Sequence, residues 1–144
     1  MNLKIEKLEK KHINAVLEIE QLSFADPWNK GMFEKEIKLG VSNFFIFELQ
    51  DKIIGYGGFW DFSDEADIVN LAVHPDYRSK GVGKKILNYL LSVLNEKKVK
   101  KVFLEVRNSN ENAKKLYGFA GFEKVGMRPK YYCNEDAVLM AKNL

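Results

Sequence analysis

The amino-acid sequence predicts a mixed α/β (α+β) fold, in which a mostly antiparallel central sheet of about seven strands is flanked by about four helices. Two observations lead to this fold class. Three consecutive apolar runs separated by short polar turns, within residues 43–73, have the pattern of an antiparallel meander. A strand–helix–strand crossover follows within residues 68–106, and a crossover of this kind joins parallel strands. The sheet is therefore expected to be mixed.

The chain is expected to begin with one strand and two helices. Residues 3–8 alternate apolar and polar side chains, which indicates a partly exposed strand, and residues 12–22 have apolar side chains at helical spacing. Pro27 disfavours helical geometry at the residue before it and so ends this first helix region. A second helix is predicted over residues 30–39, and Gly40 is placed to end it.

The meander strands are expected at residues 43–49, 53–62 and 66–73. Three glycines in the middle strand weaken it and indicate a bulge or the close approach of another element. These glycines are Gly55, Gly57 and Gly58. The remaining elements are a helix that includes residues 86–94, a strand at 99–106, a helix at 108–120, and final strands at 122–127 and 136–141. Residues 128–135 are expected to connect the last two strands.

Composition limits the classes of function. With 144 residues, of which 46% are apolar, the chain has enough length for a sizeable core, and we expect one domain over residues 1–144. A net charge of +3, from 23 basic and 20 acidic residues, is too balanced to indicate direct nucleic-acid binding. No apolar run approaches the ~20 residues of a membrane span. One cysteine, Cys133, rules out an intrachain disulfide, and without a visible signal peptide we expect a cytoplasmic location.

A glycine-bearing loop, Arg78-Ser-Lys-Gly81-Val-Gly83, lies between the strand that ends at Val73 and the next helix. Backbone N–H groups and the dipole of a helix N-terminus attract anions, and glycine lets an anion approach the backbone. The loop therefore predicts a seat for phosphate. It matches neither the Walker pattern nor the dinucleotide fingerprint, because Ile86 stands where the latter needs a glycine. A loop that only turns the chain is the alternative.

Glu105 interrupts the apolar strand of residues 102–106. An ionised carboxylate inside a protein is costly unless it is paired or reaches water. Burial raises the pKa of a carboxyl group, which suits a general base. The alternative is an ion pair, for example with Arg107 on the same face of the strand.

Asn110 and Tyr117 are seven residues apart, or about two helical turns, so both are expected on one face of the predicted helix. An amide and a phenol on one face can line a cleft. A helix-capping asparagine and a core tyrosine form the alternative.

Trp28, Tyr131 and Tyr132 are candidate walls of a peptide site, with ordinary packing as the alternative. His12 and His74 have no ligands at metal-site spacing, and Cys133 has no local metal motif. We therefore expect no metal.

Further motifs extend from about residue 3 to about residue 141. They are Ser23-x-x-x-Pro27-Trp28, Gly55-Tyr56, Leu104-Glu-Val-Arg107, Asn110-x-x-Ala113-x-x-Leu116-Tyr117, Gly121-Phe122 and Arg128-x-x-Tyr131-Tyr132. Together with the glycine loop, which is similar to motif A of the GNAT superfamily of N-acetyltransferases, they resemble its ribosomal-protein alanine N-acetyltransferase (RimI) branch. One departure is Gly118-Phe-Ala120, where charged or longer residues are more usual.

The resemblance implies a fold whose fourth and fifth strands splay apart, with acetyl-coenzyme A entering the gap. It implies Glu105 as general base and Tyr117 as general acid. It also implies cofactor contacts along the strand end, through its backbone, and from the loop and the last helix. The implied contacts are Leu71, Ala72, Val73, Arg78, Ser79, Lys80, Gly81, Val82, Gly83, Lys84 and Asn110.

The implied function is direct transfer of acetyl from acetyl-coenzyme A to the N-terminal α-amine of a protein. The implied acceptor is the alanine-starting small-subunit ribosomal protein numbered eighteen. Two alternatives stay open. One is a different amine acceptor, such as another protein N-terminus, a lysine, a polyamine or an antibiotic. The other is a coenzyme A-sensing or partner-binding module without turnover.

Overall fold

The computed structural model describes residues 1–132 and 135–144, except for the side chain of residue 132. The strands are β1 (Lys4–Lys7), β2 (Ser42–Leu49), β3 (Lys52–Phe62), β4 (Glu65–Val73), β5 (Lys101–Arg107), β6 (Glu123–Tyr132) and β7 (Glu135–Asn143). The α-helices are α1 (Ile13–Ser23), α2 (Lys30–Lys38), α3 (Val82–Glu96) and α4 (Glu111–Phe119), and two short 3₁₀ helices are η1 (Lys10–His12) and η2 (Pro75–Tyr77). None of the helices in this description is long and apolar enough to cross a membrane.

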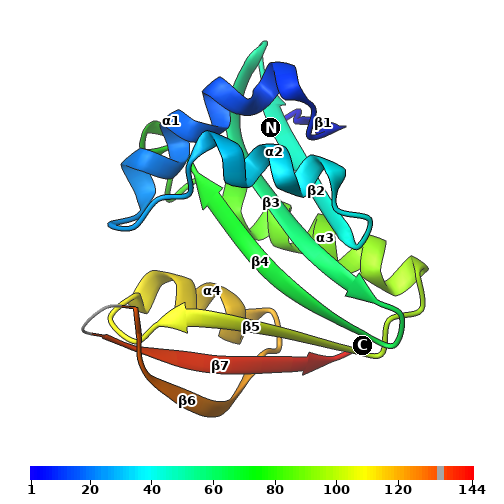
Figure 1. The fold of residues 1–144 in the computed structure, drawn as a ribbon, viewed down its shortest axis with the longest axis vertical. Coiled ribbons are helices and arrows are strands. Elements are labelled where there is room, and N and C mark those ends of the chain that lie inside the picture. The colour runs from blue at the N-terminus through cyan, green and yellow to red at the C-terminus, as the bar shows by residue number, and fades with distance from the viewer. Residues whose placement is uncertain (133–134) are drawn as a thin grey trace.

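The strands form one sheet in the order β1-β2-β3-β4-β5-β7-β6. The β4–β5 pair is parallel and every other neighbouring pair is antiparallel. Figure 1 shows α3 carrying the chain from the end of β4 back to the start of β5. The predicted meander, crossover and mixed sheet are confirmed.

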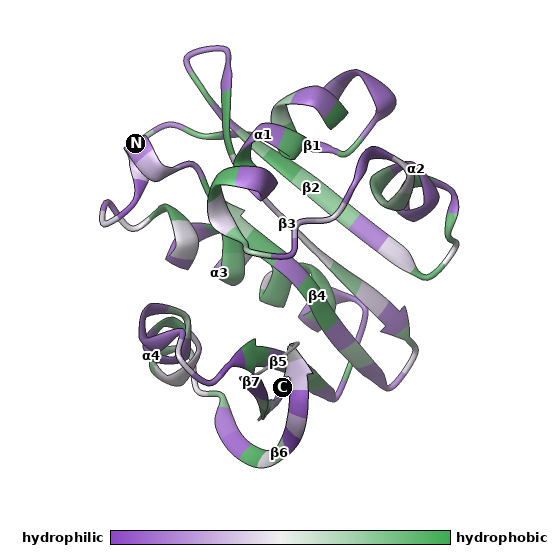
Figure 2. Cartoon of the chain, turned by 60° about the vertical axis from the view of Figure 1, so that its left-hand side comes forward, coloured by the Kyte–Doolittle hydropathy of each residue, from purple (hydrophilic) through white to green (hydrophobic). Residues whose placement is uncertain are grey.

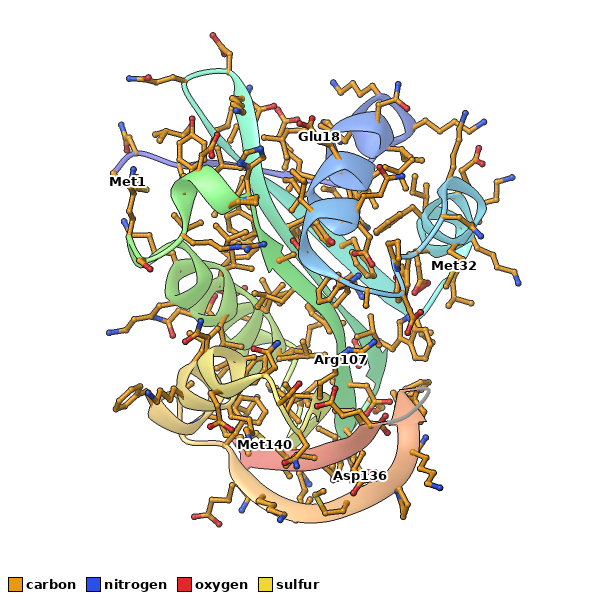
Figure 3. All side chains as sticks on the ribbon, turned by 90° about the vertical axis from the view of Figure 1, so that its left-hand side faces the viewer. Met1, Glu18, Met32, Arg107, Asp136 and Met140 are labelled. Atoms are coloured by element: carbon orange, nitrogen blue, oxygen red, sulfur yellow. The ribbon has the colours of Figure 1, made fainter. Side chains whose placement is uncertain are left out.

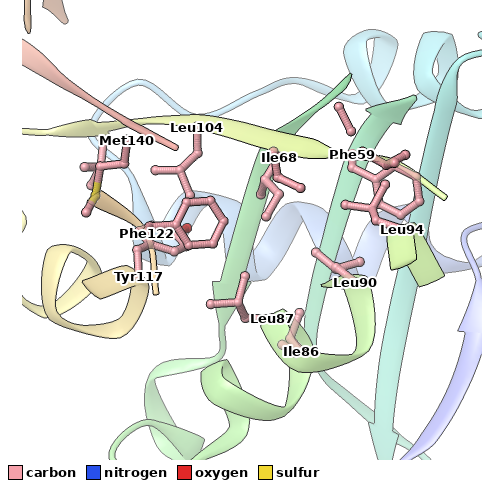
Figure 4. Close-up of a cluster of buried hydrophobic side chains, with 14 of the residues drawn as sticks. Phe59, Ile68, Ile86, Leu87, Leu90, Leu94, Leu104, Tyr117, Phe122 and Met140 are labelled. Carbon is pink, nitrogen blue, oxygen red and sulfur yellow. The ribbon is translucent and has the colours of Figure 1, made fainter. Parts of the chain in front are cut away.

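Two hydrophobic cores lie on opposite faces of the sheet. One core joins α3 and α4 to β3, β4, β5 and β7, and Figure 4 shows part of it around Leu87, Leu104 and Phe122. The other core joins α1 and α2 to β2 and β3. Hydrophobic residues accordingly run along β2, β3 and α3 in Figure 2. The sheet is therefore covered on both faces over its first four strands.

The glycines of β3 explain how closely α3 packs. A Cβ atom at Gly55 would lie 2.7 Å from Cδ1 of Ile86, and one at Gly57 would lie 2.8 Å from Cγ2 of the same residue. The register between β3 and β4 also shifts between Gly58 and Phe59. The sequence pattern indicated a bulge or a close approach, and the structure contains both.

The expected connection over residues 128–135 is wrong. β6 continues to Tyr132, β7 starts at Glu135, and these two residues pair with each other. The register shifts between Arg128 and Tyr132, across Pro129, which has no N–H to give to the ladder. Because of this irregularity, the periodicity of apolar residues in the sequence did not predict a strand here. The first strand is also shorter than expected, at Lys4–Lys7.

Candidate active site

β4 and β5 pair over their first residues and then separate. Within the described residues, their parallel register runs from Glu65 opposite Lys101 to Ile68 opposite Leu104. In Figure 1 the two strands are close at one end and far apart at the other. The register with β3 skips Val69, and a bulge of this kind bends a strand. The splay that the resemblance implied is therefore present.

A cavity of about 180 Å³ occupies the gap between the separated strands, and we call it the gap cavity. Its lining comes from residues 68–71 of β4, residues 104–107 of β5, three residues of the α4 region, and the segment from Glu20 to Trp28. The segment from Glu20 to Trp28, which begins in α1, lies on one face of the sheet, and α4 lies on the other. The gap cavity is therefore lined by residues from both faces of the sheet.

A second space of about 550 Å³ lies beside it, and we call it the aromatic groove. Its aromatic lining is Trp28, Trp60, Phe103 and Tyr131. Its charged lining is Asp67, Glu105 and Arg128. Glu105 borders both spaces, so a group in the gap cavity and a group in the aromatic groove can meet at this carboxylate.

Glu105 is held by a residue of β6. Its Oε1 lies 2.9 Å from Nη2 of Arg128, and the Glu105 side chain is 26% exposed. The ion pair that was the alternative for Glu105 is therefore present, but its partner is Arg128 instead of the suggested Arg107. The guanidinium of Arg107 lies 3.0 Å from Asp26 and 3.5 Å from Glu135. Figure 3 shows Arg107 in the region between the two halves of the sheet. Leu139 of β7 lies opposite both Glu105 and Gly126. Arg128 is two residues beyond Gly126 on the same face, so its guanidinium reaches Glu105 across β7.

The glycine loop leads into α3 with a left-handed residue. Gly81 is the N-cap at φ 81°, and a Cβ atom added there would meet no atom within 4 Å. The N–H of Lys85 donates to the carbonyl of Gly81 at 3.1 Å, the first hydrogen bond within the helix. The N–H groups of Val82, Gly83 and Lys84 come before it and therefore have no acceptor inside the helix. These donors, at the positive end of a 15-residue helix, fit a phosphate group.

Arg78, an exposed residue, supports the loop through two side-chain hydrogen bonds. Its Nε donates to the carbonyl of Val73 at 3.0 Å, and its Nη2 donates to Oγ of Ser23 at 2.9 Å. The side chain ties the end of β4 to the end of α1. In this structure its guanidinium braces the loop, whereas the resemblance implied contact with the cofactor, which stays a prediction. Lys80 lies over the ring of Tyr77, 5.6 Å from its centroid.

The free edge of β4 faces the gap. The N–H of His74 donates to the carbonyl of Ile54 in β3 at 2.8 Å. Because successive residues of a strand alternate in direction, the N–H and C=O groups of Val73 and Leu71 point to the opposite edge. There the N–H of Leu71 donates to Oδ1 of Asn70 at 2.9 Å. The carbonyl of Val73 accepts from Arg78, so the N–H of Val73 and the C=O of Leu71 are the groups that this edge can offer to an extended arm, as to an added strand.

Asn110 and Tyr117 each have a structural role, as a helix cap and a packed ring, and each also lines the cavity. Asn110 caps α4, where its Oδ1 accepts from the N–H of Ala113 at 3.1 Å. Tyr117 is buried and its ring packs 5.8 Å from that of Phe122 (Figure 4). Both side chains nevertheless line the gap cavity. The cleft on one helix face is confirmed, and capping and packing are how the fold positions it.

A buried carboxylate that was not predicted from the sequence lines the same cavity. Glu20 is 1% exposed and accepts hydrogen bonds from the hydroxyl of Tyr56, from Nδ2 of Asn70 at 2.8 Å and from the N–H of Trp28 at 2.9 Å. Burial, with the nearby Glu20 charge, raises the pKa of Tyr56 well above its usual range. The sequence signal that could have identified Glu20 is its position four residues after Val16, on the buried face of α1.

Of the three aromatic candidates, two are described. Trp28 packs against Phe33 at 5.2 Å between ring centroids and lines both spaces. Tyr131 is 49% exposed and lies under the guanidinium of Arg128 at 4.7 Å. The side chain of Tyr132, and Cys133, lie outside the described residues.

His12 does have acidic neighbours in space, contrary to what its sequence position indicated. Ligand atoms of Glu6, Glu9 and His12 lie within 4.8 Å of one another. However, Nδ1 of His12 accepts from the N–H of Glu9 at 2.9 Å, and Nε2 lies 3.3 Å from Glu6. With both ring nitrogens engaged, this arrangement offers no ready imidazole ligand. The expectation of no metal stays a prediction.

The family model of the GNAT acetyltransferases matches residues 13–122. The chain therefore belongs to the GNAT family of acetyltransferases. It is 36% identical over 142 residues to the ribosomal protein bS18-alanine N-acetyltransferase of Haemophilus ducreyi, covering 95% of this chain and 97% of that protein. It is 34% identical over 141 residues to the enzyme of that name from Escherichia coli K12, covering 95% of both.

Solved structures agree with this placement. The crystal structure of the ribosomal-protein-S18-alanine N-acetyltransferase from Escherichia coli superimposes with a TM-score of 0.92 at 32% identity, covering 99% of this chain and 94% of that one. Ard1 from Thermoplasma volcanium superimposes with a TM-score of 0.93 at 26% identity, covering 100% and 99%. The predicted fold class and family are confirmed.

Proposed function

We propose that the chain transfers the acetyl group of acetyl-coenzyme A to the N-terminal α-amine of a protein, with residues 1–144 acting as one domain. The observation that carries the proposal is the position of Glu105 between the gap cavity and the aromatic groove. Two substrates that approach from opposite faces can react there without a covalent enzyme intermediate. The cytoplasm is the proposed location, and the reaction requires neither nucleic acid nor a membrane.

The relatives support a particular acceptor. Curated proteins that align along nearly the whole chain at 34–36% identity are named for alanine acetylation of ribosomal protein bS18. The proposed acceptor is therefore the N-terminal alanine of that ribosomal protein. Other protein N-termini, lysine, polyamines and antibiotics are the acceptors that the experiment below must compare.

The residues present fit acetyl-coenzyme A. The left-handed Gly81 and the first turn of α3 offer backbone donors to a diphosphate, with Ser79, Lys80 and Lys84 near them. The free edge of β4 at Leu71–Val73 suits the amide groups of the pantetheine arm. Asn110 lies at the rim of the gap cavity. Bound acetyl-coenzyme A supplies the thioester whose acetyl group is transferred.

Two side chains, Glu105 and Tyr117, carry out the two proton transfers of the proposed reaction. An α-amine has an ordinary pKa of about 7.7–8.0, so near neutral pH much of it is protonated and not nucleophilic. Glu105 accepts a proton from the amine, directly or through water. The N–H of Val73 donates to the oxygen on which negative charge develops. Tyr117 donates a proton to the departing sulfur.

A product assay tests the proposal. Purified protein is incubated with acetyl-coenzyme A and a panel of amines: an alanine-starting peptide of bS18, the same peptide with a blocked N-terminus, free lysine and spermidine. We expect thiol release and a mass gain of one acetyl group only with the free alanine N-terminus. Turnover on the blocked peptide or on spermidine, without turnover on the alanine N-terminus, would refute the assignment.

A further inference from the structure

The aromatic groove contains a carboxylate that the proposed chemistry does not use. Asp67 lies in β4, opposite Trp60 in the β3–β4 register and opposite Phe103 in the β4–β5 register. The other carboxylate of the groove, Glu105, is paired with Arg128. Among the described groove residues, Asp67 is the carboxylate without an ion-pair partner.

The surroundings of Asp67 favour a cation. Partial burial raises the pKa of its carboxyl group, and the negative charge of Glu65 adds to the rise. A desolvated carboxylate beside another negative charge is stabilised when a positive group comes within hydrogen-bond distance. A cationic ligand would therefore offset the unfavourable effects of burial and of the Glu65 charge on the Asp67 carboxylate.

A fixed aromatic ring stands next to this carboxylate. Nε1 of Trp60 donates to Oε1 of Glu36 at 2.8 Å, and Glu36 is only 7% exposed. This bond holds the indole in place as a wall of the groove. A flat ring beside a carboxylate is complementary to lysine or arginine, whose apolar stem or guanidinium lies on the ring while its charge meets the carboxylate.

The spacing relates Asp67 to the start of the acceptor. Phe103 lies opposite Asp67, and Glu105 is two residues further along β5. With about 3.3 Å per residue and about 4.8 Å between strands, the Cα atoms of Asp67 and Glu105 are separated by at least about 8 Å, since β5 diverges from β4 beyond Leu104. An extended acceptor with its α-amine at Glu105 therefore brings the side chain of its second or third residue to Asp67.

We propose that Asp67 and Trp60 form a subsite for a lysine or arginine side chain at the second or third position of the acceptor protein. The proposal rests on the N-terminal acetylation proposed above and adds to it a preference for basic N-terminal segments. Asp67 is a specificity residue in this scheme and takes no part in proton transfer.

Steady-state kinetics on equal-length alanine-starting peptides tests the subsite. One peptide is neutral at positions 2 and 3, two carry arginine at one of these positions, and two carry glutamate there. The wild-type kcat/KM should be roughly threefold to tenfold higher for arginine than for the neutral residue at one of the positions. Asp67→Asn should bring this ratio close to one, and Asp67→Lys should shift the preference to glutamate.

Asp64→Asn is the matched control, because it removes the same charge from an exposed turn outside the groove. It should keep the wild-type ratio. Equal kcat/KM for the neutral and arginine peptides in the wild type, or a ratio that survives in Asp67→Asn, would overturn the subsite and leave the proposed function standing. Failure of the wild type to acetylate any of the peptides would instead overturn both.

Discussion

At the scale of single residues, the ion pair between Glu105 and Arg128 bears most directly on mechanism. Arg128 is 52% exposed, and half-exposed pairs of this kind contribute roughly 0–1 kcal/mol to stability. Losing the pair should therefore leave the protein folded. Kinetic effects at Glu105 can then be separated from effects on stability.

Glu105→Gln keeps the size of the side chain but removes its ability to accept a proton. Acetylation of an alanine-starting peptide at pH 7 should fall by roughly 10²–10⁴-fold, the usual effect of losing a general base. Raising the pH should restore part of the rate, because the acceptor amine then loses its proton to solvent. The pH–rate profile of the folded variant is the measurement.

Arg128→Gln is the control for this variant, because it breaks the same ion pair and keeps the carboxylate. If Glu105 were only a structural partner, both variants would lower the rate equally at every pH. Partial recovery at high pH that is confined to Glu105→Gln identifies the base.

Tyr117→Phe removes one hydroxyl from a buried ring that packs against Phe122. The packing should hold, so the melting temperature should change little. Turnover should fall by roughly 10²–10⁴-fold, because the departing thiolate loses its proton donor. Rapid-quench measurement of the transfer step, beside calorimetry of cofactor binding, checks both statements. Normal turnover across the pH range would reduce Tyr117 to a packing residue.

At the scale of elements, the loop and first turn of α3 determine whether a phosphate group can bind. A Cβ atom at Gly83 would lie 3.5 Å from Leu116, which is ordinary contact. Gly83→Glu should therefore fold, while its bulk and negative charge occupy the anion seat. We expect at least a tenfold loss of acetyl-coenzyme A affinity by calorimetry, about 1.4 kcal/mol.

Gly118→Glu provides the matched control, since it introduces the same side chain at an exposed position of α4 where an added Cβ meets nothing within 4 Å. Its affinity for the cofactor should resemble that of the wild type. Unchanged affinity in Gly83→Glu would contradict the phosphate seat.

At the scale of the whole molecule, a polar chain bridges segments that are far apart in the sequence. Arg107 contacts Asp26 on one side and Glu135 on the other, and Oε2 of Glu135 accepts from the N–H of Ser109 at 2.7 Å. The connection between α1 and α2 is thereby joined to β5, β7 and the approach to α4. This chain lies beside the open end of the gap between β4 and β5.

The pH dependence of stability should report this bridge. Hydrogen bonds from Ser109, with the charge of Arg107, hold the pKa of Glu135 below its ordinary value of 4.5. A carboxyl group with a lowered folded-state pKa stabilises the fold at higher pH, and this stabilisation is lost as the pH falls through the folded-state pKa. Glu135→Gln should therefore flatten the fall in urea-unfolding free energy below about pH 4.5.

Glu123→Gln removes an exposed carboxylate of β6 and serves as the reference for that experiment. This variant should show the same fall in unfolding free energy at low pH as the wild type. Parallel curves for wild type and Glu135→Gln would show that the bridge has no thermodynamic effect.

The sequence alone determined the parts of this protein that depend on local chemistry. Apolar periodicity placed the meander, the crossover helix and the mixed sheet, because a helix or a half-buried strand must repeat its apolar side chains at its own period. The loop before α3 indicated an anion seat because a helix N-terminus has donors without partners. The interruption of β5 by Glu105 and the two-turn spacing of Asn110 and Tyr117 indicated the cleft.

The tertiary structure decided which distant residues meet. Nothing local associates Glu105 with Arg128, Glu20 with Tyr56 and Asn70, or Arg107 with Asp26, since these pairs are 23 to 81 residues apart and come together only through the order and curvature of the sheet. The irregular register around Pro129 also hid the end of β6 from periodicity. Pairing across a sheet depends on register, and register is set by the packing of the whole fold.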